Sequence, residues 1–300
     1  MKFLPRPKSY DLRGKVVLIT GGNGGIGSDT AEELLRRGSR VTIVDLAPDT
    51  PERASRLHPA HALGVVGDVR HRDALAAAVA ASIDRFGRVD VVIANAGLLP
   101  KAATLRTTPE SDVDTALAVN VSGVVNTVDA ALEQVLANHG QVVLISSVFA
   151  FVNGMGAIPY AMSKAAVEQL GRGLRIELVD AGASVLTAYF SLVDTDMIKH
   201  GVDEDPEVLD LLGALPRQMM KRVTPTSAAI AIADGLERRA PRVIHPARWT
   251  IISAARGVLG PVLDKKLTTD RTVLDVLARL DKRGPQLQSP TTTTSRKKIS

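Results

Sequence analysis

The sequence of 300 residues contains no cysteine. This absence excludes disulfides, thiol nucleophiles and thiolate metal ligands, so any chemistry must use other side chains. It fits a reducing compartment, and we expect a cytoplasmic protein. No stretch has the roughly 18 uninterrupted apolar residues of a membrane-spanning helix, and the N-terminal segment lacks the apolar run of a signal peptide. We therefore expect no membrane span.

The chain also carries only a small excess of charge of one sign. The formal net charge is +5, but Arg296, Lys297 and Lys298 supply three positive charges, which leaves about +2 on the rest of the chain. A bias this weak and scattered argues against a nucleic-acid partner. Residues 284–300 contain no acids and are dominated by proline, glutamine, serine and threonine. We expect them to form a disordered basic tail.

Hydrophobic residues make up 45% of the sequence, enough for a full core. Short apolar runs rich in β-branched residues alternate with helical patterns, which is typical of strands buried on both faces of a parallel sheet. The alternation predicts an α/β fold with a Rossmann-like, doubly wound parallel sheet of about seven strands and helices on both faces, spanning residues 1–246. We expect strands at 16–20, 41–45, 89–94, 142–146, 185–189 and 242–245, and helices at 26–37, 73–86, 110–138 and 160–180.

The segment TGGNGGIG, residues 20–27, lies between the first predicted strand and the first predicted helix. In such a turn the pyrophosphate of a dinucleotide lies on the helix N-terminus. Spaced glycines let the backbone approach the phosphate where a Cβ atom would obstruct it. A flexible turn is the alternative, but the flanking strand and helix favour a cofactor loop. The residues assigned to it are Gly21, Asn23, Gly24, Gly25, Ile26 and Gly27.

Asp45 ends the second predicted strand, at the interval expected for the acid that binds the adenosine ribose. Its carboxylate would accept hydrogen bonds from both ribose hydroxyls and repel a 2′-phosphate. The next residue, Leu46, and the loop residue Gly24 offer no cation for a phosphate. This predicts NAD rather than NADP, although Arg40 and Arg70 could lie nearby. The alternative is that Asp45 only caps a turn.

Tyr160 is one of only three tyrosines and stands four residues before Lys164. On a helix the two side chains share a face. A phenol with an ordinary pKa of about 10 needs a pKa near 7 to act as a base at neutral pH, and a nearby ammonium favours the phenolate. We therefore expect Lys164 to lower the pKa of Tyr160. The alternative is a packed aromatic beside a solvated surface lysine.

Six motifs follow one another in a characteristic order: TGxxxGxG, Asp68-Val69, Asn95-Ala96-Gly97, Asn120, Ser147 and Tyr160-x-x-x-Lys164. This order resembles the short-chain dehydrogenase/reductase family over about residues 10–246. The resemblance implies that Ser147 orients the substrate oxygen, while Tyr160 takes its proton and the cofactor takes a hydride. It also implies that Lys164 holds the nicotinamide ribose and that Asn120 holds a water on the proton path.

The same resemblance assigns the rest of the cofactor site. Asp68 would bind the adenine amino group, with Val69 covering the ring, and Asn95, Ala96 and Gly97 would pass beneath the ribose. A purely structural turn is compatible with the same placement of these last three residues. Val193 and Thr195 would meet the nicotinamide amide. The family's usual Pro-Gly before them is replaced here by Phe190-Ser191, next to the substrate side.

Residues 198–222 form an insertion where this family places its substrate lid. The lid and the positions after two motifs are apolar, which predicts a fairly large lipophilic alcohol or ketone as substrate. The alternative is that these side chains complete the core or a subunit contact. They are Leu98, Leu99, Phe149, Phe151 and Val152 after the motifs, and Leu209, Leu211, Leu212, Leu215, Met219 and Met220 in the lid. Asp203, Glu204 and Asp205 should lead into a helix N-terminus.

We expect a C-terminal helical extension over residues 247–283, with a polar amphipathic helix at 270–283. Residues 247–267 are apolar with basic residues at both ends and invite two interpretations. They could pack on the body or on a second subunit, or lie on a membrane surface through Trp249, Ile251, Ile252, Leu259 and Leu263. Gly257, Gly260 and Pro261 should interrupt a long helix here, which favours packing.

Together these observations predict an NAD-dependent oxidoreductase that interconverts a secondary alcohol and a ketone, as a homodimer or homotetramer. We assign no metal ligands. Two alternatives are an NAD(H)-sensing regulator without turnover and a membrane-surface scaffold built on the extension. The combination of Ser147, Tyr160, Lys164 and Asn120 argues against a sensor, which needs no proton path.

Overall fold

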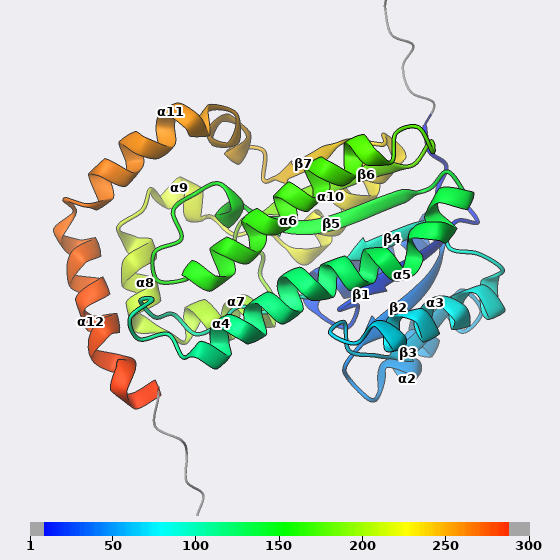
Figure 1. The fold of residues 1–300 in the computed structure, drawn as a ribbon, viewed down its shortest axis with the longest axis horizontal. Coiled ribbons are helices and arrows are strands. Elements are labelled where there is room, and N and C mark those ends of the chain that lie inside the picture. The colour runs from blue at the N-terminus through cyan, green and yellow to red at the C-terminus, as the bar shows by residue number, and fades with distance from the viewer. Residues whose placement is uncertain (1–8, 288–300) are drawn as a thin grey trace, which may run out of the picture.

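A computed structural model describes residues 9–287 of the chain, with side chains described up to residue 283. All seven strands form one parallel sheet in the order β3-β2-β1-β4-β5-β6-β7 (Figure 1). The predicted fold class is confirmed. The strands are β1 Val16–Thr20, β2 Arg40–Asp45, β3 Ala62–Val66, β4 Val91–Ala94, β5 Gln141–Ser147, β6 Ser184–Phe190 and β7 Arg242–His245.

Strand β3 is the one strand without a predicted position. It lies at the edge of the sheet, so Val66 is exposed, and its apolar run is broken by Gly64. A Cβ atom at Gly64 would lie 2.3 Å from the backbone oxygen of Thr50, at the start of helix α2, Thr50–Leu57. Close packing of this helix on β3 therefore requires glycine at residue 64, and this glycine interrupts the apolar run from which the strand could have been predicted.

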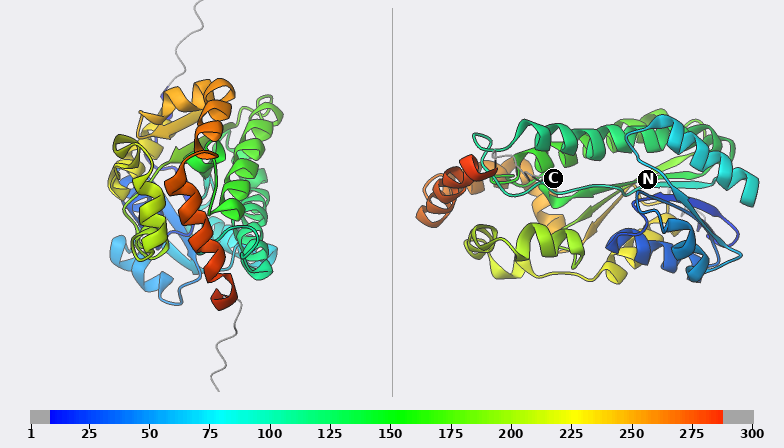
Figure 2. Two further views of the ribbon diagram at one scale, coloured as in Figure 1. Left: turned by 90° about the vertical axis from the view of Figure 1, so that its left-hand side faces the viewer. Right: turned by 90° about the horizontal axis from the view of Figure 1, so that it is seen from below.

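Two layers of helices cover the sheet (Figure 2). On one face, buried residues of α1, α2 and α10 pack against β1, β2 and β6. On the other, α3, α5 and α6 pack against β1, β4 and β5. The bounds not yet given are α1 Gly25–Arg36, α3 Arg72–Phe86, α5 Gly123–Ala137, α6 Ile158–Glu177 and α10 Pro225–Glu237.

The predicted helix at 110–138 is one helical run with a change of winding inside it. Helix α4, Glu110–Leu117, passes through the π-helical turn η1, Ala118–Ser122, into α5. By length and composition the run Glu110–Ala137 could cross a membrane. It packs on α3, α6 and β4, however, so it is a core helix of the fold. Asn120 lies in the π turn, a feature common at functional sites.

The predicted lid, residues 198–222, folds as short helices beyond β6. These are α7 Asp196–Ile198, the π turn η3 Lys199–Asp203, α8 Pro206–Gly213 and α9 Arg217–Met220. The carboxylate of Asp205 accepts hydrogen bonds from the backbone N–H groups of Glu207 and Val208, at 3.1 and 3.4 Å. The acidic run therefore leads into a helix N-terminus, as predicted.

The C-terminal extension contains two helices, α11 Trp249–Leu267 and α12 Arg271–Leu287. Contrary to our prediction, Gly257, Gly260 and Pro261 do not interrupt α11. A proline inside a helix removes one hydrogen bond and crowds the carbonyl four residues earlier. Here that residue is Gly257, whose backbone can adjust more freely than that of other residues.

Helix α12 packs on α8, at the end of the molecule that also holds α11 (Figure 1). It ends at Leu287, so the predicted basic tail does not begin at residue 284. The rest of that tail, residues 288–300, lies outside the described part of the chain.

Candidate active site

The carboxyl ends of neighbouring strands bring the predicted site residues together. The glycine loop follows β1, Asn95 to Gly97 follow β4, Ser147 ends β5, and residues 191–195 follow β6. Because these strands are parallel and adjacent, the four segments meet at one edge of the sheet.

Parts of the glycine loop are packed so tightly that a side chain would not fit. Gly21 has a φ of +64°, and a Cβ atom there would lie 2.7 Å from Cα of Ala96. A Cβ atom at Gly25 would lie 2.5 Å from Cγ2 of Thr195, and one at Gly27 only 2.2 Å from the oxygen of Gly21. The loop therefore opens directly onto the N-terminus of α1, the geometry that suits a pyrophosphate.

Asp45 is tied to this loop. One carboxylate oxygen accepts a hydrogen bond from the backbone N–H of Asn23 at 3.0 Å, and the other accepts from Ala47 at 3.3 Å. The side chain of Asn23 donates to Thr50 at 2.7 Å. Asp45 therefore does cap a turn, and the same hydrogen bonds hold its carboxylate beside the glycine loop. Leu46 is 65% exposed next to it.

Cations near Asp45 differ from those considered from the sequence. Arg40 begins β2 and Asp45 ends it, so the strand separates them by about 16 Å. Arg70 is bound to Asp68, with Nε 2.9 Å from a carboxylate oxygen, and these hydrogen bonds hold the pKa of Asp68 below its ordinary value. Sequence reasoning missed Arg53 of α2, which pairs with Asp49 at 2.8 Å and lies close enough for an electrostatic interaction with Asp45.

Arg53 also lines a cavity of about 270 Å³ beside the glycine loop. The other lining residues are Gly22, Asn23, Ser28, Arg56 and Leu57. Two arginines next to the loop therefore bear on the choice between the two nicotinamide cofactors.

Three of the residues predicted to contact the cofactor also stabilise the fold around the site. The side-chain amide of Asn95 donates to the backbone oxygens of Thr20 and Gly21, at 3.0 and 2.9 Å, which fixes the turn after β4. Val69 is buried, packed against Gly123. Thr195 donates to the oxygen of Val193 at 3.3 Å, which fixes the turn after β6, and its methyl group packs against Gly25 of the glycine loop.

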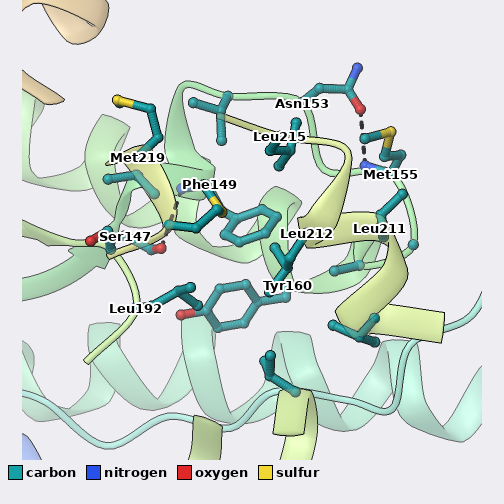
Figure 3. A pocket seen from close by; sticks show the side chains of 18 of the residues that line it. Ser147, Phe149, Asn153, Met155, Tyr160, Leu192, Leu211, Leu212, Leu215 and Met219 are labelled. Carbon is teal, nitrogen blue, oxygen red and sulfur yellow. Dashed lines mark hydrogen bonds between the residues drawn. The ribbon is translucent and has the colours of Figure 1, made fainter. Parts of the chain in front are cut away.

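Ser147 and Tyr160 both line one pocket (Figure 3). The hydroxyl of Ser147 accepts from the backbone N–H of Phe149 at 3.2 Å and donates to the oxygen of Phe190 at 3.3 Å. The ring of Phe149 meets Tyr160 edge to face, with centroids 5.7 Å apart. The phenol hydroxyl points toward the Ser147 end of the pocket.

Lys164 is buried one turn beyond Tyr160. Its ammonium donates to the oxygen of Ile145 at 3.1 Å and lies 5.5 Å from the centre of the Tyr160 ring. Burial lowers the pKa of Lys164 to about 8. Burial also raises the pKa of Tyr160 to about 12, against a smaller lowering by the Ser147 hydroxyl. The predicted lowering by Lys164 is therefore not seen here, because desolvation of the phenolate dominates.

Asn120 connects the loop after β4 to helix α6. Its amide oxygen accepts from the N–H of Leu98 at 2.8 Å, and its nitrogen donates to the oxygen of Leu98 at 2.9 Å and to Ser163 at 3.1 Å. A Cβ atom at Gly97 would lie 3.2 Å from the Asn120 oxygen and 3.5 Å from the Lys164 nitrogen. The glycine therefore keeps open a small space that both polar groups face.

The pocket has a volume of about 530 Å³ and is mostly apolar. Of the predicted wall residues, Leu98 and Leu209 do not line it, and Leu209 is 46% exposed. The others do line it: Leu99, Phe149, Phe151 and Val152 on one side, and Leu211, Leu212, Leu215, Met219 and Met220 from the lid. Figure 3 shows the lid leucines facing Phe149 and Tyr160 across the cavity.

The C-terminal extension forms a further wall that sequence reasoning left open. Trp249, Ile252, Arg256, Gly260 and Leu263 of α11 line the pocket. Ser191, where the family usually has glycine, lines it too. On the other side of α11, Ile251, Val258 and Val262 are exposed, so the helix has two apolar faces.

A family model described as short chain dehydrogenase matches residues 15–205. The chain belongs to the short-chain dehydrogenase family. Membership makes it an oxidoreductase with a nicotinamide cofactor. Within residues 9–287, no group of three histidine or acidic side chains lies in position to hold a metal ion.

Two relatives of this short-chain dehydrogenase illustrate the range of the family. It is 32% identical to 2-(R)-hydroxypropyl-CoM dehydrogenase of Xanthobacter autotrophicus, over 74% of this chain and 91% of the relative. It is 33% identical to cis-2,3-dihydrobiphenyl-2,3-diol dehydrogenase of Paraburkholderia xenovorans, over 56% of this chain and 62% of the relative.

Solved structures show the same fold. Levodione reductase matches with a TM-score of 0.69 and 25% identity, over 78% of this chain and 96% of that one. The NADH complex of 3-ketoacyl-(acyl-carrier-protein) reductase from Brucella melitensis matches with a TM-score of 0.68 and 24% identity, over 78% of this chain and 97% of that one. Both are matched nearly in full, so this chain has segments without a counterpart in them.

Proposed function

We propose that this short-chain dehydrogenase interconverts a lipophilic secondary alcohol and its ketone with NAD. The observation that carries the proposal is the placement of the Ser147 and Tyr160 hydroxyls in a mostly apolar cavity of about 530 Å³, with Lys164 behind them. The names of the two relatives both denote dehydrogenation of a hydroxyl-bearing compound, which supports the reaction class.

The residues present fit a nicotinamide dinucleotide. The glycine loop gives the pyrophosphate backbone N–H groups without obstruction, and Asp45 lies beside it for the adenosine ribose. Lys164 would hold the nicotinamide ribose, with Val193 and Thr195 at the amide. When bound, the oxidised nicotinamide accepts a hydride, and its positive charge favours a phenolate nearby.

Ser147 and Tyr160 would handle the substrate oxygen. The Ser147 hydroxyl turns from the oxygen of Phe190 to donate to the substrate oxygen and orient it. A neutral Tyr160 donates a proton to that oxygen during ketone reduction, and its phenolate removes the proton during alcohol oxidation. A water held in the space at Gly97, which Lys164 and Asn120 face, would carry the proton onward.

The chemistry of the walls supports a lipophilic substrate. Near Ser147 and Tyr160 the lining consists mainly of apolar side chains, among them phenylalanine, leucine, valine and methionine. The charged lining residues are Arg256, Asp264, Lys266 and Asp270, all from the C-terminal extension, and Arg256 is paired with Glu168. Lys164 lies behind the hydroxyls and does not line the pocket, so a short hydroxy acid would find no cation in the lining beside them. Each buried methylene, by contrast, contributes about 0.8 kcal/mol.

The reaction is tested with a panel of secondary alcohols of rising chain length, their ketones and a short hydroxy acid, by following NADH absorbance. We expect kcat/KM to rise about fourfold per methylene until the pocket is full. A flat series or a preference for the hydroxy acid would overturn the lipophilic assignment. Tight NADH binding with no turnover of any compound would favour the NAD(H)-sensing regulator instead.

The preference for NAD over NADP is tested by the ratio of kcat/KM values for the two cofactors. A carboxylate beside a 2′-phosphate disfavours NADP by a few kcal/mol, or about 100-fold. Asp45→Ala should reduce this ratio, and Arg53→Ala should lower the residual NADP activity. A wild-type enzyme that favours NADP would contradict the assignment and give the Arg53 and Arg56 cluster the deciding role. Cytoplasmic location and a homodimer or homotetramer stay predictions.

A further inference from the structure

One face of helix α11 forms the pocket wall contributed by the C-terminal extension. Trp249, Ile252, Arg256, Gly260 and Leu263 follow one another at intervals of three or four residues, the spacing of a single helical face. All of them line the pocket that contains Ser147 and Tyr160. The helix thus lies beside the same cavity as the reacting groups.

Polar contacts hold this wall in a defined position. The Arg256 guanidinium donates to both carboxylate oxygens of Glu168 on α6, at 2.9 and 2.6 Å. Asn153, which precedes α6, donates to Asp264 at 3.0 Å. Trp249 at the start of α11 is only 5% exposed. Since α6 also carries Tyr160, these contacts fix the wall relative to the reacting hydroxyl.

Gly260 occupies the middle of the pocket-facing side of α11. A Cβ atom built there would have no atom within 4 Å, so the cavity is open at this point. Its neighbours on the same face, Arg256 and Leu263, both carry large side chains. A side chain at residue 260 would therefore occupy space that the pocket otherwise offers to a ligand.

We propose that α11 sets the length of substrate that the pocket accepts, and that Gly260 keeps room for the distal part of a long lipophilic chain. The inference rests on the proposed function for the identity of the reacting end. The pocket wall itself does not depend on the reaction.

The test compares Gly260→Leu with two matched controls. Gly260→Ala carries the same Cβ atom before Pro261, so it reports any backbone strain of a non-glycine residue at that place. Ala254→Leu adds the same side chain at a residue of α11 that is exposed and does not line the pocket. If Gly260→Leu fails to fold, Gly260→Leu and Gly260→Ala are both made in a Pro261→Ala background.

The measurement is kcat/KM for secondary alcohols of rising chain length. For Gly260→Leu we expect kcat/KM to stop rising at least two methylenes earlier than for the Gly260→Ala and Ala254→Leu controls. The longest alcohols should lose about 10-fold or more, because each lost methylene is worth about fourfold. A length profile equal to that of Gly260→Ala, or an equal loss at every length, would overturn the proposal.

A binding readout separates this proposal from the proposed reaction. Trp249 is the only tryptophan in the chain and lines the pocket, so its fluorescence reports ligand binding without turnover. Ketones of rising chain length should bind the wild-type protein more tightly with each methylene and reach an earlier limit in Gly260→Leu. If no compound is turned over but this limit shifts, the reaction is wrong and the length limit stands. If alcohols are turned over but the length limit does not shift in Gly260→Leu, the reaction stands and the length limit is wrong.

Discussion

Replacing Gly25 with alanine places a methyl group 2.5 Å from Cγ2 of Thr195 and 3.1 Å from its Cβ. The Thr195 methyl cannot rotate away without moving its hydroxyl, which donates to the oxygen of Val193 at 3.3 Å. Either the glycine loop or the segment after β6 must shift. Both segments are assigned to the cofactor, so the change tests their joint role.

Overpacking of this kind costs about 1–3 kcal/mol. If the strain falls on the cofactor complex, the affinity for NADH drops by about 5- to 150-fold. Adding Thr195→Ser to Gly25→Ala removes Cγ2 and leaves the 3.1 Å approach to Cβ as the closest contact, which a small shift relieves. The double variant should therefore recover most of the lost affinity.

The assay is a titration of NADH fluorescence, with thermal unfolding as a check on the fold. Gly24→Ala is the matched control, because its added Cβ would lie 3.6 Å from the nearest atom, the oxygen of Gly21. It should weaken NADH binding much less. Equal affinities for the two alanine variants, or no recovery with Thr195→Ser, would refute the reasoning about this loop.

Three further predictions concern the reacting pair and the pocket wall. Tyr160→Phe should lower turnover about 100-fold or more with NADH binding intact, and a near-normal kcat would contradict its role. Because burial lowers the pKa of Lys164 from 10.5 to about 8, the unfolded state binds more protons between these values. The contribution of Lys164 to the free energy of unfolding should then rise with pH from about 8 to 10.5. Lys164→Met should remove this rise, as measured by thermal unfolding at several pH values. An unchanged pH dependence of stability in the variant would contradict the buried, charged role of Lys164. Arg256→Gln loses the charged bonds to Glu168 and should raise KM for long alcohols severalfold while leaving short ones nearly unchanged, whereas equal changes would place the effect elsewhere.

Most of the sheet and the meeting of the site residues could be predicted from the sequence. Buried parallel strands carry continuous β-branched runs, so β1, β2, β4, β5 and β6 stand out. The edge strand β7 is marked only by its short Val243-Ile244 pair. The Asn95 and Ser147 motifs sit at strand ends, so parallel topology brings them to one edge of the sheet, and Tyr160 follows on α6, the helix after β5. Local patterns suffice here because strand order and direction determine the site.

Features that depend on tertiary packing could not be predicted. The position of β3 was hidden because an edge strand needs less apolar sequence and Gly64 serves a neighbouring helix. Helix α11 has apolar residues on both sides, so its pattern does not reveal which side meets the pocket. The pKa of Tyr160 depends on how deeply the fold buries the phenol, and spacing from Lys164 cannot reveal that.

The central claim is that hydride leaves the carbinol carbon of a lipophilic secondary alcohol and that Tyr160 takes the hydroxyl proton. The most direct measurement incubates the protein with NAD and a long-chain secondary alcohol deuterated at that carbon, and analyses the NADH by mass spectrometry. We expect NADH that carries one deuterium, formed at least about 100-fold more slowly by Tyr160→Phe. NADH without deuterium, or equal rates for the two proteins, would contradict the account.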